Sequence, residues 1–306
     1  MPQTTIGELL GNQPHIERLL RLEKERRGVP KDGLVFVGTS NVAHYYWCAM
    51  QAVFRSRREE EKFFLVYLQG RWEYALELGL IDRLPKDDEA LLAVGNEVTH
   101  RLIEELLKKR ACQKEDSGTR TTIIEEFYNE RGEKVTITYP HSDKEPPLIS
   151  IETAEGVRIA DLEEFPILRG EFLHELRGEK YPTIRWNFPW GRYVVVGVPD
   201  GITDRFVYEF KTTRIMHFVR PVAMTQADLY GHFFNRDVKR VQILDMATQK
   251  TMTWEGPVDK NRAEGVLGDF SKVDGGWIPS TTTRSLGKEL AAGLMESQKR
   301  GAASRA

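Results

Sequence analysis

Two apolar runs lie close together in residues 194–214, which read VVVGVPDGITDRFVYEFKTTR. One apolar run ends at Asp200, and the next run contains Glu209, Phe210 and Lys211. Side chains point alternately to the two faces of a β-strand, so Glu209 and Lys211 are predicted to share one face and Phe210 to take the other. The connection after Asp200 is short enough for its carboxylate to join them. We therefore expect two acids and one amine to meet on adjacent strands.

Helical periodicity is predicted in four further segments, at residues 14–27, about 40–58, 90–109 and 224–235. The segment 90–109 carries a wide apolar stripe and is the clearest helix of the chain. Residues 238–246 form an apolar run that is typical of a buried strand. Helices and strands are therefore expected to mix in an α/β fold.

Residues 113–165 differ in residue pattern from the rest of the chain, because short alternating runs are separated there by turn residues. This pattern predicts β-hairpins, and we interpret the stretch as an insertion. A length of 306 residues with 40% hydrophobic content allows one large core. The expected organisation is a helical extension at residues 1–30, a main domain at residues 31–284 that contains the insertion, and a C-terminal helix with a flexible tail at residues 285–306.

Charge and cysteine content limit the classes of function. The formal net charge is -2 at pH 7, so a nucleic-acid site must be a local basic face. No apolar run has the length of a membrane span, and the first residues lack the order of a signal peptide, so we expect a cytoplasmic protein without a membrane partner. Cys48 and Cys112 are too few for a four-cysteine zinc or iron-sulfur site.

The acids and the lysine carry a resemblance to a known family. Asp200, followed nine residues later by Glu209 and then by Lys211, is similar to the motif of the PD-(D/E)XK nucleases. The segment from Gly95 to His100, which reads GNEVTH, resembles the glycine-to-histidine helix of the RecB-like branch of this superfamily.

Two other segments extend the resemblance. Gln226 and Tyr230 match the downstream glutamine-to-tyrosine helix of the RecB-like branch, and residues four apart lie on one helical face. The segment from Ser40 through Tyr45 to Cys48 resembles the N-terminal signature of the CRISPR-associated Cas-four exonucleases. No cysteine follows Cys112, so the iron-sulfur cluster of that family is not expected here.

The resemblance implies a restriction-endonuclease-like core, in which a central mixed β-sheet is flanked by helices, with the β-hairpin region inserted into it. It also implies a metal site, with His100, Asp200, Glu209 and the backbone carbonyl of Phe210 as ligands of Mg2+ or Mn2+. Carboxylate and water suit both of these ions, and imidazole favours transition metals.

By the same resemblance, Asp200, Glu209 and Lys211 are the catalytic residues. The metal would lower the pKa of its bound water, and Lys211 would orient that water or stabilise the transition state. Gln226 and Tyr230 would position the DNA strand or the lysine, and Arg214 would contact DNA. Further basic residues near the site could follow the backbone, namely Arg220, Arg236, Lys239 and Arg240.

The expected function is that of a metal-dependent deoxyribonuclease that hydrolyses phosphodiester bonds. Its partners would be single-stranded DNA or DNA ends, with possible protein partners in a repair, recombination or CRISPR adaptation complex. One alternative is a nuclease-fold DNA- or protein-binding subunit with weak or no catalysis. Another is an unrelated α+β protein, in which the Glu209 and Lys211 pair lies on a surface hairpin and His100 on a helix surface.

Overall fold

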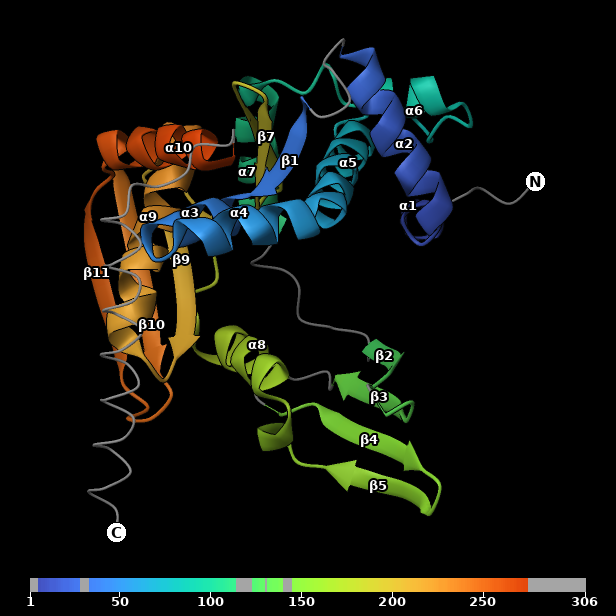
Figure 1. Cartoon of the computed structure of the whole chain (residues 1–306), viewed down its shortest axis with the longest axis vertical. Coiled ribbons are helices and arrows are strands. Elements are labelled where there is room, and N and C mark those ends of the chain that lie inside the picture. The colour runs from blue at the N-terminus through green and yellow to red at the C-terminus, as the bar shows by residue number, and fades with distance from the viewer. Residues whose placement is uncertain (1–4, 28–32, 114–122, 130, 140–144, 275–306) are drawn as a thin grey trace.

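The computed structural model describes residues 5–27, 33–113, 123–129, 131–139 and 145–274 (Figure 1). The helix and tail predicted at residues 285–306 lie outside these described residues. The helices are α1 (Ile6–Leu10), α2 (Gln13–Arg26), α3 (Thr39–Ala43), α4 (Ala49–Arg58), α5 (Glu60–Glu77), α6 (Asp88–Ala93), α7 (His100–Gln113), α8 (Pro166–Arg177), α9 (Met216–Phe233) and α10 (Lys260–Asp274), with 3-10 turns η1 (His44–Tyr46) and η2 (Leu162–Glu164). The strands are β1 (Val35–Gly38), β2 (Ile123–Tyr128), β3 (Lys134–Tyr139), β4 (Leu148–Thr153), β5 (Gly156–Ala160), β6 (Trp186–Trp190), β7 (Tyr193–Gly197), β8 (Gly201–Ile202), β9 (Phe206–Thr213), β10 (Val238–Asp245) and β11 (Thr251–Pro257).

The main body contains two mixed sheets instead of the single central sheet that the sequence predicted. The first has the strand order β1-β7-β6, with β1 parallel to β7 and β6 antiparallel to it. The second has the order β11-β10-β9-β8, with β9 and β10 parallel. The α/β class is confirmed, but the strand before Asp200 and the strand of Glu209 are not hydrogen-bonded neighbours. One reason is Pro199, which has no N–H with which to continue the ladder of β7.

Helices cover both faces of the first sheet (Figure 1). Phe36, Val194 and Val196 point into a core shared with α2, α5 and α6. Val37 and Val195 point the other way, into a core shared with α4, α7, α9 and α10. The alternation along β1 and β7 therefore buries both faces, as expected for strands that carry near-continuous apolar runs.

The inserted region is a four-stranded antiparallel sheet in the order β2-β3-β4-β5. The prediction of β-hairpins between residues 113 and 165 is therefore confirmed for the described strands. This sheet has a small core of its own, which includes Val135, Ile137, Ile149 and Ile151. In Figure 1 it lies apart from the main body, and α8 lies between the two.

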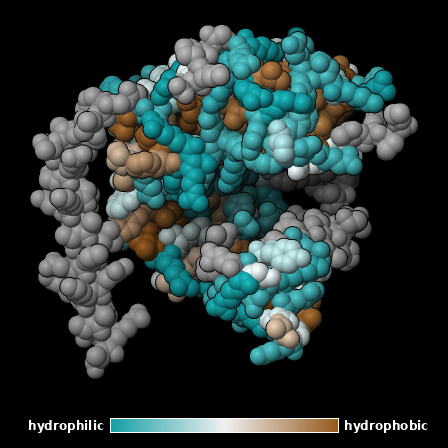
Figure 2. Space-filling view, turned by 45° about the vertical axis from the view of Figure 1, so that its right-hand side comes forward, coloured by the Kyte–Doolittle hydropathy of each residue, from teal (hydrophilic) through white to brown (hydrophobic). Residues whose placement is uncertain are grey.

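Helix α8 contacts both units. Leu168 belongs to the core of the inserted sheet, whereas Leu173 packs with Phe210 and its neighbours on β9. Figure 2 shows the surface hollowed between the main body and the inserted sheet, over a face that is largely hydrophilic. Among the described helices, none combines the length and the apolar character needed to cross a bilayer.

The helix predicted at residues 90–109 is broken in the structure. Helix α6 ends at Ala93 and α7 begins at His100, with a turn between them. Gly95 has a φ of +77° in this turn, and a Cβ there would lie 2.8 Å from the backbone oxygen of Arg71. A left-handed backbone and a close approach to α5 both require glycine. The helix predicted at residues 224–235 also differs, because α9 already begins at Met216 and contains Pro221.

We predict that Gly95→Ala destabilises the protein more than Gly79→Ala does. Both positions have a positive φ, so both substitutions strain the backbone at a cost of about 1 kcal/mol. Only at Gly95 does the added methyl also collide with α5, because Gly79 has open space around it. We expect a loss of about 2–3 kcal/mol for Gly95→Ala, measured by urea unfolding. Equal losses in the two variants would contradict this account of the turn.

Candidate active site

The structure brings Asp200, Glu209 and Lys211 together. Asp200 lies between β7 and β8, and its Oδ2 accepts a hydrogen bond of 2.7 Å from the backbone N–H of Phe210. Glu209 and Lys211 lie on the same face of β9, where the ammonium donates to Oε1 of the carboxylate. The predicted alternation along this strand is therefore confirmed.

Phe210 has its side chain on the opposite face of β9, in a cluster with Leu173 and Tyr208. In a strand, the N–H and C=O groups of one residue point to the same side. The Phe210 carbonyl therefore points toward the side of Asp200. Strand β8 pairs with β9 only at Val207 and Tyr208, so this carbonyl lies beyond the end of that ladder.

The two acids differ sharply in their environments. The side chain of Glu209 is 1% exposed, and burial, together with the negative charge of Asp200, raises its pKa to about 8. Burial also acts on Asp200, but the charges of His174 and Lys211 and the Phe210 N–H outweigh it and lower the pKa of that carboxyl. Burial disfavours the charged form of Lys211, yet the two carboxylates outweigh it and raise the pKa of the amine.

His174 completes this cluster, although no pattern in the sequence predicted it. It lies on α8, with its Nε2 atom 3.4 Å from Oδ1 of Asp200 and its ring 4.9 Å from that of Phe210. The carboxylate of Asp200, and to a smaller extent Glu175, raise the pKa of His174 to about 9. No spacing in the sequence links this histidine to the acids, because the packing of α8 on β9 brings it there.

The structure does not place the predicted ligand His100 in this cluster. His100 is exposed at the first turn of α7, and its ring lies 4.8 Å from that of Trp186 on β6. The break at Gly95 separates α7 from the helix on which the prediction placed His100. The position near Asp200 that the resemblance gave to His100 is taken by His174.

Gln226 and Tyr230 lie on one face of α9, as predicted, but both are buried. The Gln226 amide donates to the Tyr230 hydroxyl over 3.3 Å, and that hydroxyl donates to the carbonyl of Val198 over 3.1 Å. They therefore hold the chain just before Asp200 in place. Arg214, by contrast, is exposed directly after β9 and remains accessible to a ligand.

The basic residues on and after α9 that were expected to follow DNA have partners within the protein. Arg236 is buried and pairs with both carboxylate oxygens of Glu104, at 2.8 Å each. Lys239 pairs with buried Asp228, and Arg240 pairs with Glu179 and Glu255. Arg220 lies over the ring of Trp254, 4.6 Å from its centroid. The suggestion that Arg236, Lys239 and Arg240 follow a DNA backbone is therefore not supported by their contacts.

A cavity of about 650 Å³ opens beside the cluster. It is lined by Asp200, Phe210 and Lys211 from the main body, by His174 on α8 and by Tyr139 at the end of β3. The inserted sheet therefore contributes to the wall of the site. This cavity lies between the two units that Figure 1 shows joined by α8.

The donor atoms fit a divalent cation that keeps part of its water shell. Oε2 of Glu209 is buried without a hydrogen-bond partner, and the Phe210 carbonyl points toward Asp200. Among the described residues, no three His, Cys, Asp or Glu side chains form a ready-made metal cluster. Mg2+ commonly binds through one or two carboxylates and retains several waters, so two acids and a carbonyl meet its needs.

Comparisons with known proteins identify no family. No family model matches the chain, and no curated protein sequence matches it. Among solved structures, the chain is similar to the one described as the crystal structure of SSO0001, with 14% identity over 89% of this chain and 88% of that chain. The TM-score of this match is 0.29, and a likeness at that level supports no conclusion about fold or function.

We predict that Lys211→Met destabilises the protein by about 1–3 kcal/mol, because it leaves the buried Glu209 carboxylate without its cation. Adding Glu209→Gln to this variant removes the unpaired charge and should recover at least half of the loss. The free energies of unfolding are measured by urea titration at about pH 9, above the Glu209 pKa of about 8, so that the buried carboxyl is charged in the wild type. Lys250→Met, at an exposed lysine, is the control and should change stability by less than about 0.5 kcal/mol. Failure of Glu209→Gln to restore stability would show that the pair is not coupled.

Proposed function

We propose that this chain is a divalent-metal-dependent DNA nuclease with a restriction-endonuclease-like core of the PD-(D/E)XK type. One observation carries the proposal. Asp200 and Lys211 line a cavity, Lys211 pairs with buried Glu209 beneath it, and one buried oxygen of Glu209 has no partner among the described residues. A buried, unpartnered carboxylate oxygen costs free energy, and a cation bound beside it would offset that cost.

Asp200, Glu209 and the carbonyl of Phe210 would hold Mg2+ or Mn2+. When bound, the ion would lower the pKa of its water and neutralise charge on the scissile phosphate. The carboxylate of Asp200 is already ordered by the Phe210 N–H, so its second oxygen has a fixed direction. Lys211, whose side chain is 32% exposed, can reach the cavity and donate to the attacking water or to the phosphate.

An exposed aromatic surface near the site supports a single-stranded substrate. Tyr46, Trp47 and Phe54 are exposed on η1 and α4, and the ring of Trp47 lies 4.2 Å from that of Phe218 on α9. Helix α9, which follows the strand of Lys211, contacts η1. Unpaired bases can stack on such rings, whereas bases in a duplex cannot. The chain would thus act on single-stranded DNA or DNA ends during repair, recombination or CRISPR adaptation.

We predict Mg2+- or Mn2+-dependent degradation of single-stranded DNA by the full chain. Asp200→Asn and Lys211→Met should each reduce the rate by roughly a hundredfold or more, because they remove a metal ligand and a fixed charge at the reacting phosphate. The measurement is gel analysis of an end-labelled oligonucleotide. Asp204→Asn, at an exposed aspartate without a contact to the site, is the matched control and should keep full activity. DNA binding without cleavage by the folded wild type would instead favour the non-catalytic subunit.

We also predict that His174, and not His100, supports metal binding. His174→Ala should weaken Mn2+ binding by about tenfold or more, because the ring orients the Asp200 carboxylate. His100→Ala should leave the dissociation constant unchanged, since that ring lies against Trp186. Isothermal titration of each folded variant with MnCl2 gives the comparison. The reverse outcome would restore the ligand set that the sequence resemblance implied.

A further inference from the structure

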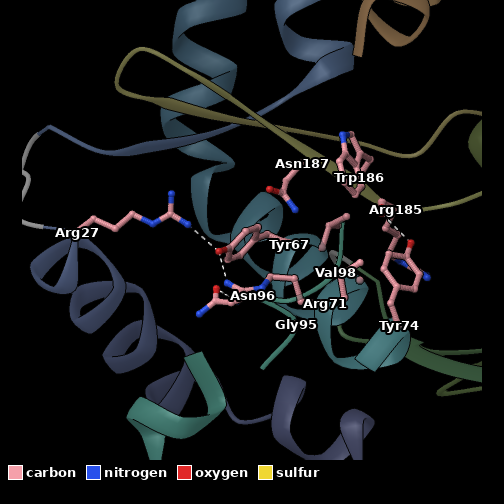
Figure 3. A pocket seen from close by; sticks show the side chains of 12 residues that line it. Arg27, Tyr67, Arg71, Tyr74, Gly95, Asn96, Val98, Arg185, Trp186 and Asn187 are labelled. Atoms are coloured by element: carbon pink, nitrogen blue, oxygen red, sulfur yellow. Dashed lines mark hydrogen bonds between the residues drawn. The ribbon is translucent and has the colours of Figure 1, made fainter. Parts of the chain in front are cut away.

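A second cavity, of about 160 Å³, lies between α5, the turn that joins α6 to α7, and β6 (Figure 3). Arg27, Tyr67, Arg71 and Asn96 converge on it from one side, and Asn187 lies opposite them. Among the described residues, none that lines it is acidic. Its volume is well above the roughly 10–15 Å³ that one water molecule needs.

Arg71 is the central group of this cavity. Its side chain is buried, with 5% of the residue exposed. Its guanidinium donates to the hydroxyl of Tyr67, to Oδ1 of Asn96 and, over 3.4 Å, to the carbonyl of Ala93. All three partners are neutral, and no carboxylate in the described part of the chain lies within ion-pair distance of it. Five N–H donors belong to a guanidinium, so the Nε–H and one Nη1–H have no partner among the described residues.

Two acids close to the lining residues already have ion-pair partners. Glu23 is fully buried and pairs with Arg26 and Arg27, at 2.7 and 2.8 Å. Glu73 pairs with Arg185 at 2.7 Å. Arg71 is therefore a buried positive charge that has no ion-pair partner among the described residues, and it reaches Glu23 only through the shared Tyr67 hydroxyl. Burial of an unpaired charge is costly, and an anion in the cavity would offset that cost.

We propose that this cavity binds a phosphate group. An arginine fork presents parallel donors that match two oxygens of a phosphate, and Arg71 has two donors left for this. Arg27 supplies further N–H groups, since it uses only its Nε toward Glu23 and one Nη2–H toward Tyr67. The Asn187 amide, for which no hydrogen bond is formed with the described residues, completes the donor set. The group is either free inorganic phosphate or the terminal phosphate of a nucleic-acid strand.

This site is separate from the one formed by Asp200, Glu209 and Lys211, and the two share no lining residue. The proposal therefore does not rest on nuclease activity. The phosphate site requires no metal, whereas the proposed catalytic centre does. Titrations in the presence of EDTA consequently report on this cavity alone.

The test is isothermal titration of the full chain with inorganic phosphate in EDTA, using wild type, Arg71→Gln and Asn187→Asp. Saturable binding by the wild type, weakened about tenfold or more in both variants, is the expected result, because a charge-assisted donor is lost in one and a repelling carboxylate is added in the other. Asn187→Asp breaks no hydrogen bond of the described structure, so it stays informative if Arg71→Gln fails to fold. Asn261→Asp makes the same chemical change at an exposed position and should bind as the wild type does.

The same titration with oligonucleotides distinguishes the two sources of phosphate. Tighter binding of a terminally phosphorylated strand than of its hydroxyl-ended equivalent, lost in Asn187→Asp, identifies a strand end as the ligand. Equal binding of the two strands, with inorganic phosphate still bound, identifies free phosphate. The proposal is overturned if the folded wild type shows no saturable phosphate binding, or if Asn187→Asp binds phosphate as tightly as Asn261→Asp does.

Discussion

The hydrogen bond from the Phe210 N–H to the Asp200 carboxylate is the contact on which the candidate site depends. Strands β7 and β9 belong to different sheets, and the chain after β7 is joined to β9 by the short β8 ladder at Gly201 and Ile202. The side-chain bond extends this connection to Asp200 itself, and the hydroxyl of Tyr230, which donates to the Val198 carbonyl, supports the loop from the other side. Charge-assisted hydrogen bonds are stronger than those between neutral groups, so this contact can fix the position of a functional carboxylate.

Burial and charge are balanced differently at the two cavities. At the first, buried Glu209 is partly compensated by Lys211, and one of its oxygens is left without a partner. At the second, buried Arg71 is held only by neutral groups. Each cavity therefore lacks a charge of one sign, and the two signs are opposite. Such imbalances reduce stability, and they are typical of positions where a protein binds something that it does not itself contain.

The sequence predicted the local features of the site and missed those that arise from packing. Alternation along β9 correctly placed Glu209 and Lys211 on one face, because strand periodicity needs only neighbouring residues. Helix α5 carries no single apolar stripe, since it is buried on much of its circumference, and its periodicity therefore gave no prediction. The turn at Gly95 was read as helix, because its glycine is required by contact with Arg71 and not by its neighbours in sequence. His174 could not be found at all, since its approach to Asp200 depends on how α8 packs.

That packing gives the inserted sheet influence over the site, although none of its described residues contributes a charged group there. Helix α8 is anchored through Leu168 in the inserted sheet and through Leu173 on β9, and His174 directly follows the second anchor. A change in the tilt of the inserted sheet is therefore transmitted along one rigid element to the gap between an imidazole and a carboxylate. Substitutions confined to that sheet can in this way change the pKa of Asp200 while every residue of β9 stays the same.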